Sequence, residues 1–181
     1  MFTGVRLKVG LLYSRFHFRK SKDPVLRFTE AISRARRALV ILPNATRDIT
    51  SVQWIIRNLT ERFSSGSLTI VATPDQLQWM NKDAGGHYQI VSYDVKDIST
   101  WFVPRQELLG KVKRSTFDVA FDLNLGFVLH SAFLCRESKA PLRVSFAKNY
   151  ADEFYNFQLN TTSTNSLAIA YRNLVRCMEM F

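Results

Sequence analysis

Short apolar runs alternate with amphipathic stretches along most of the chain. The apolar runs lie near residues 38–42, 68–72, 88–93, 118–123 and 142–147. Between the first two runs, Val52, Ile55, Ile56 and Leu59 recur at helical spacing. Strands that alternate with helices are typical of βαβ units in a parallel sheet. The pattern therefore predicts the α/β class, with a Rossmann-like three-layer sandwich around a five-stranded parallel sheet.

The same pattern divides the chain into three parts. Residues 1–22 form a basic N-terminal arm, residues 23–159 form the α/β domain, and residues 160–181 form a polar linker followed by a helix. Asp23 and Pro24 predict a helix start, with an acidic N-cap and proline in the first turn, for a helix over Pro24–Arg37.

The net charge of +10 is concentrated at the N-terminus. Residues 1–37 hold ten Lys and Arg against two acids, whereas residues 38–181 hold fifteen against thirteen. This asymmetry predicts contact of residues 1–37 with an anionic membrane surface. The alternative is a helix packed on the domain with solvated charges. Nucleic acid is disfavoured as a partner, because no binding module accompanies the charge.

The sequence lacks the motifs of several kinds of segment and binding site. No apolar run reaches the length of about 18 residues that a membrane span needs, and no signal peptide is recognisable. We therefore expect a cytoplasmic protein, peripheral at the inner membrane if the arm binds there. The turn Pro43–Asp48 contains no glycine, and neither a dinucleotide fingerprint, a P-loop nor a metal motif occurs. We expect no cofactor and no metal.

Candidate chemistry is left to a few polar residues that follow strands. Asp122 and Asn124 end the fourth apolar run, and Asp48 begins the helix after the first. In parallel sheets ligands bind beyond the carboxyl ends of the strands. Asp48 could be a general base toward an acceptor hydroxyl, or only a helix cap. Asp122 and Asn124 could equally be caps of the following turn.

A family resemblance rests on the last predicted βαβ unit, FDVAFDLN, SAFLC and APLRVSF. These segments resemble the N-terminal domain of glycosyltransferase family 9, the heptosyltransferase-like enzymes of lipopolysaccharide synthesis. The resemblance covers about residues 38–158. It implies that Asp48 corresponds to the proposed catalytic base, although Arg47 replaces the preceding glycine. The acceptor-binding residues are then assigned to the polar positions Asn44, Asp122, Asn124 and Ser131.

The chain is shorter than a two-domain transferase of that family, whose nucleotide sugar binds chiefly the C-terminal domain. The sequence therefore predicts a stand-alone heptosyltransferase-like domain of cell-envelope glycan synthesis without autonomous catalysis, which binds a glycolipid acceptor. One alternative is half of a two-protein glycosyltransferase, with a separate donor-domain protein as partner. A second is an α/β interaction module with no carbohydrate role.

Overall fold

The computed structural model describes residues 2–44, 48–63, 67–80, 88–161 and 166–180. Two expected loops fall partly outside these ranges. Residues 45–47 of the turn after the first strand are not described, and neither are residues 162–165 of the polar linker.

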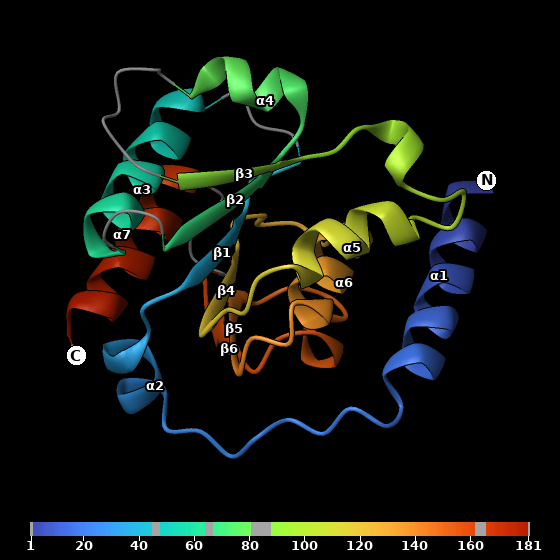
Figure 1. Ribbon diagram of the computed structural model, residues 1–181, viewed down its shortest axis with the longest axis horizontal. Coiled ribbons are helices and arrows are strands. Elements are labelled where there is room, and N and C mark those ends of the chain that lie inside the picture. Colours follow the sequence, from blue (N-terminus) through green and yellow to red (C-terminus); the bar gives the residue numbers. More distant parts are fainter. Residues whose placement is uncertain (1, 45–47, 64–66, 81–87, 162–165, 181) are drawn as a thin grey trace.

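The centre of the fold is a parallel sheet in the order β3-β2-β1-β4-β5-β6 (Figure 1). Its strands are β1 (Ala38–Ile41), β2 (Leu68–Ala72), β3 (Tyr88–Ser92), β4 (Val119–Asp122), β5 (Leu142–Phe146) and β6 (Phe157–Leu159). The chain winds outward from β1 through β2 and β3, then returns to the other side of β1 as β4. The carboxyl ends of β1 and β4 therefore flank a topological switch point.

The predicted α/β class and parallel sheet are confirmed, but the predicted strand number is wrong. Within the described residues the sheet has six strands rather than five, because Phe157–Leu159 adds the edge strand β6 beside β5. This strand has three half-buried residues and follows an aromatic segment. So short a run carries no alternating pattern that would distinguish it from a loop.

Helices cover both faces of the sheet. They are α1 (Phe2–Phe18), α2 (Phe28–Arg34), α3 (Ile49–Arg62), α4 (Pro74–Trp79), α5 (Gln106–Lys113), α6 (Leu129–Glu137) and α7 (Leu167–Glu179), with short 3-10 turns η1 (Val95–Asp97) and η2 (Ala151–Glu153). Helices α3 and α7 lie side by side on one face, and α1, α5 and α6 lie on the other (Figure 1). Each face has its own apolar core, which gives the three layers.

The helix predicted over Pro24–Arg37 is shorter in the structure, where α2 spans only Phe28–Arg34. Asp23 does not cap it; its carboxylate instead lies 2.7 Å from the buried Arg143 guanidinium. A buried cation is costly without an anionic partner, and Asp23 supplies one. After Ala35 the chain is extended, and the amides of Arg36 and Arg37 donate to the Asp118 carboxylate at 2.9 and 2.8 Å.

The N-terminal arm is a helix that packs on the domain. Leu11 and Phe18 of α1 are buried in the core shared with α5 and α6, and the Phe18 ring lies 4.8 Å from that of Phe133. A Cβ on Gly10 would lie 2.1 Å from the carbonyl oxygen of Trp101, so only glycine permits this approach. The structure thus contains the packed helix that was one of the two expectations; contact with a membrane stays a prediction.

Candidate functional site

The switch point at the carboxyl edge of the sheet is bridged by the side chain of Asn124, which follows β4. Its Oδ1 accepts from the backbone N–H of Asn44 at 2.6 Å, and its Nδ2 donates to the carbonyl of Leu42 at 3.4 Å. Both partners follow β1. Asn124 is itself buried, whereas Asn44 is exposed. One amide side chain therefore fixes the ends of two central strands and leaves Asn44 facing solvent.

Asp122, the last residue of β4, lies beneath this bridge. Its Oδ1 accepts from the backbone N–H of Asn124 at 3.0 Å and from Asn124 Nδ2 at 2.6 Å. Its Oδ2 accepts from Lys148 Nζ at 2.9 Å and from the Tyr155 hydroxyl. Lys148 also donates to the carbonyl of Asn124 at 2.6 Å. Asp122 thus accepts from donors in the segments after β4, after β5 and before β6.

The electrostatics of this group follow from its burial. The side chains of Lys148 and Asp122 are 4% and 0% exposed, so the pair is shielded from water. Burial, followed by the charge of Asp122, raises the pKa of Tyr155 well above its usual value. The phenol therefore stays neutral and donates to the carboxylate. A buried carboxylate that accepts from this many donors holds the ends of these strands in fixed positions.

Helix α6 contributes two more polar residues near this edge. Ser131 is buried and accepts from Asn124 Nδ2 at 3.3 Å. His130 Nε2 lies 3.3 Å from the Tyr93 hydroxyl. Burial lowers the pKa of His130 to about 4 and raises that of Tyr93 to about 12. Both side chains are therefore neutral at neutral pH, and His130 can form a hydrogen bond without carrying charge.

Asp48, the candidate general base, is the N-cap of α3. Its Oδ1 accepts from the backbone N–H of Ser51 at 3.0 Å and its Oδ2 from the Ser51 hydroxyl at 2.5 Å. After burial, the charges of Asp122 and Asp48 both raise the pKa of Tyr171, whose hydroxyl donates to the carbonyl of Leu123 at 2.9 Å. Asp48 is half-buried and serves as the helix cap considered from sequence.

The structure thus joins four of the five assigned residues, Asn44, Asp122, Asn124 and Ser131, in one hydrogen-bonded network, with Asp48 capping the adjacent helix. Sequence analysis missed Lys148 and Tyr155, which complete the network around Asp122. Lys148 could have been found: it lies two residues beyond β5 and therefore at the same edge as Asp122. Tyr155 could not have been found in this way, because it precedes β6 and does not follow a strand.

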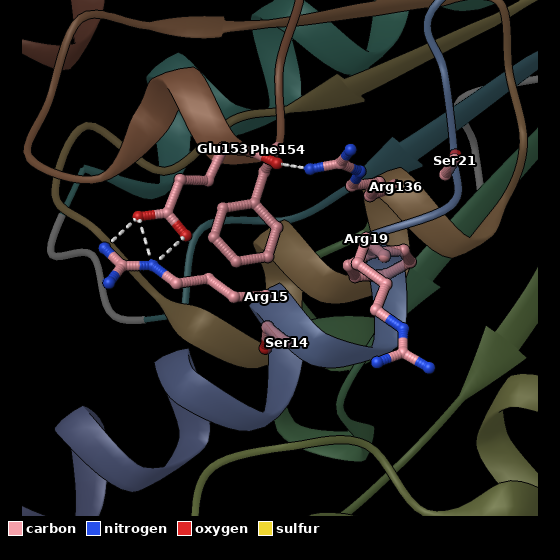
Figure 2. A pocket seen from close by; sticks show the side chains of 8 residues that line it. Ser14, Arg15, Arg19, Ser21, Arg136, Glu153 and Phe154 are labelled. Carbon is pink, nitrogen blue, oxygen red and sulfur yellow. Dashed lines mark hydrogen bonds and ion pairs between the residues drawn. The ribbon is translucent and has the colours of Figure 1, made fainter.

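A separate hollow of about 440 Å³ lies between the end of α1, α6 and η2 (Figure 2). Arg15 forms an ion pair with Glu153 there, with Nη2 2.5 Å from Oε1. Arg136 donates to the carbonyl of Glu153 and lies 4.8 Å from the Phe18 ring. Arg19 also lines the hollow and points away from the Arg15–Glu153 pair. The hollow contains more basic than acidic lining residues and shares none with the network at the sheet edge.

Comparison with known proteins supports the fold. A solved structure, the glycosyl transferase family 9 protein from Veillonella parvula DSM 2008, superposes on 79% of this chain with a TM-score of 0.55 and 15% identity. The fold is shared. The matched part is 41% of that chain, so the present chain spans less than half of its relative's length. No family profile matches the sequence, and no curated protein does.

Two findings concern the residues that the structure describes. Among them, no group of three His, Cys, Asp or Glu side chains is placed to hold a metal ion. None of the helices in the described ranges is both long and apolar enough to cross a membrane.

Proposed function

We propose that this chain is a heptosyltransferase-like domain of cell-envelope glycan synthesis that binds a glycolipid acceptor and does not transfer sugar by itself. The observation that carries the proposal is the likeness in fold to a family 9 glycosyltransferase over 79% of the chain. The polar network at the switch point supports it, because ligands of such sheets bind at this edge. We place the protein in the cytoplasm, at the inner membrane.

In this proposal, the buried and the exposed polar residues at the carboxyl edge of the sheet have different roles. Asp122, Asn124 and Ser131 are buried and bonded to one another, so they hold the ends of β1 and β4 in place. We assign the contacts with acceptor hydroxyls to exposed Asn44 and to half-buried Asp48, whose carboxylate also caps α3. An asparagine and a carboxylate suit a sugar, since together they offer donor and acceptor atoms.

The test is acceptor binding by the full chain and by variants at this edge. We expect a lipid-linked or detergent-solubilised core glycan to bind, and Asn44→Ala and Asp48→Asn to weaken that binding about tenfold each, because each removes hydrogen bonds to a sugar. Asp75→Asn, at an exposed position in the first turn of α4, is the matched control. Unchanged affinity in both edge variants would contradict this placement of the acceptor.

The second candidate function is half of a two-protein transferase. Asp48 motivates it, because a carboxylate near the acceptor site can act as a general base. Donor and acceptor must be held together for transfer, and the matched region is 41% of the family 9 chain. The chain alone should then form no product from ADP-heptose or another nucleotide sugar. Product that forms only with an added donor-binding protein, and is lost in Asp48→Ala, would favour this candidate.

A further inference from the structure

Helix α1 has two apolar faces, and the domain covers only one of them. The inner face carries Leu11, 4% exposed, and Phe18, 7% exposed. The outer face carries four exposed apolar side chains spaced four, three and four residues apart: Val5 at 59%, Val9 at 36%, Leu12 at 62% and Phe16 at 63%. This spacing places them in one stripe along the helix.

The two faces lie opposite each other. The inner positions 7, 11, 14 and 18 are shifted by two residues from the outer positions 5, 9, 12 and 16, which is about 200° around a helix of about 3.6 residues per turn. In Figure 1, α1 lies at the periphery of the molecule, with the rest of the domain on one side only. The outer stripe is therefore not part of the core, and stability of the domain does not require it.

The charged residues of the N-terminal arm are of one sign. Residues 1–22 contain six Lys and Arg and no acid, namely Arg6, Lys8, Arg15, Arg19, Lys20 and Lys22. The hollow at the end of α1 adds Arg136, and its one described acidic lining residue, Glu153, is already paired with Arg15. An apolar stripe bordered by cations is the arrangement of helices that lie in the interface of an anionic bilayer.

We propose that α1 docks the protein on an anionic membrane surface, with Leu12 and Phe16 in the boundary between headgroups and acyl chains and with the flanking Lys and Arg on lipid phosphates. A second copy fits the stripe less well. Two α1 helices placed face to face would bring their cations together with no acid on either helix, and like charges at that distance repel. The proposal goes beyond acceptor binding, because it requires no glycan.

Flotation of the full chain with vesicles tests the proposal. We expect binding to phosphatidylcholine vesicles that contain about 30% phosphatidylglycerol, and little binding to phosphatidylcholine alone. Raising NaCl from about 0.05 to about 0.5 M should weaken the binding, because screening shortens the range of the attraction. Glycan-free vesicles separate this result from acceptor binding, so either proposal can fail alone.

Paired variants locate the contact. Leu12→Ser with Phe16→Ser should lower the partition coefficient by about tenfold or more, because both apolar side chains leave the interface. Val95→Ser with Met180→Ser, at positions 89% and 73% exposed, is the apolar control. Lys8→Glu with Lys20→Glu should lower binding by about tenfold or more, whereas Arg57→Glu with Arg172→Glu, at exposed positions of α3 and α7, is the charge control.

Three outcomes would overturn the proposal. The first is the absence of binding to anionic vesicles at low salt. The second is equal loss of binding in the stripe variants and their controls. The third is self-association in solution, without vesicles, that the Leu12→Ser and Phe16→Ser pair abolishes; this would assign the stripe to a second copy of the chain.

Discussion

At the scale of single residues, the buried pair of Asp122 and Lys148 joins the ends of two neighbouring strands. Their atoms lie 2.9 Å apart at the ends of β4 and β5, and both side chains are almost fully shielded from water. A buried pair of this kind need not stabilise a fold more than apolar residues would, but removal of one partner leaves an uncompensated charge. The pair therefore fixes the edge while making it sensitive to substitution.

We expect Lys148→Met to lower the free energy of unfolding by about 3–5 kcal/mol, since Asp122 then stays buried without its cation. The double variant Asp122→Asn with Lys148→Met should cost less than the sum of the two single variants, because neither charge remains. Urea denaturation of the four proteins measures this cycle. A change below about 1 kcal/mol for Lys148→Met would mean that water reaches the carboxylate.

His130 should make the stability of the folded protein depend on pH. Its pKa is lowered to about 4 in the folded protein by burial, against about 6.5 in an unfolded chain. Between these values the unfolded state binds more protons, so stability should rise with pH over this range and be complete above about 6.5. The gain from this residue is about 3 kcal/mol.

The comparison that isolates His130 is with His130→Gln, which cannot titrate. We expect the difference in unfolding free energy between the two proteins to change by about 3 kcal/mol between pH 4 and pH 7, in favour of the histidine at the higher pH. Other titrating groups cancel in this difference. A difference that is constant with pH would show that His130 is accessible to water in the folded state.

At the scale of elements, α1 docks by close contact of its backbone with the loop at Trp101. A Cβ at Gly10 would meet the Trp101 carbonyl oxygen at 2.1 Å, whereas one at Gly4 would have no heavy atom within 4 Å. We expect Gly10→Ala to destabilise the protein by about 1–3 kcal/mol through overpacking, and Gly4→Ala to stabilise it by up to about 1 kcal/mol through helix propensity. Thermal unfolding of both variants gives the comparison; equal effects would mean that α1 is not docked.

Most elements were predictable because the apolar pattern decides them. The strand Leu68–Ala72 matches its predicted range, α3 contains the predicted helical stripe, and α7 is the helix expected after the polar linker. The errors came from tertiary contacts that no local pattern records. Asp23 was expected to cap a helix and instead pairs with Arg143, which lies in β5, far along the chain. Strand β6 forms because three residues pair with the edge of β5.

The part of the candidate site that follows the strands could be predicted, because the ends of the strands could be. Asp122 and Asn124 follow directly from the rule that polar residues gather at the carboxyl edge of a parallel sheet. The bond from Tyr155 to Asp122 could not be predicted, because the segment between β5 and β6 folds back over the edge. Burial, not residue type, decides which of the assigned residues can reach a ligand.

At the scale of the whole molecule, the two proposed binding functions belong to two different surfaces. We propose that Asn44 and Asp48 at the carboxyl edge of the sheet bind an acceptor, and that the outer stripe of α1 binds a membrane. The matched region is less than half of the family 9 chain, and a transferase needs donor and acceptor in one site. We therefore propose that the residues matched here supply the acceptor half of such a site.

The most direct measurement is a parallel calorimetric titration of the purified full chain with a core-glycan acceptor and with ADP-heptose. We expect saturable binding of the acceptor, weakened by Asn44→Ala and Asp48→Asn, and no heat of binding from the nucleotide sugar at comparable concentration. Saturable binding of ADP-heptose with none of the acceptor, or binding of neither, would contradict the proposal that this domain is the acceptor half of a glycosyltransferase-like site.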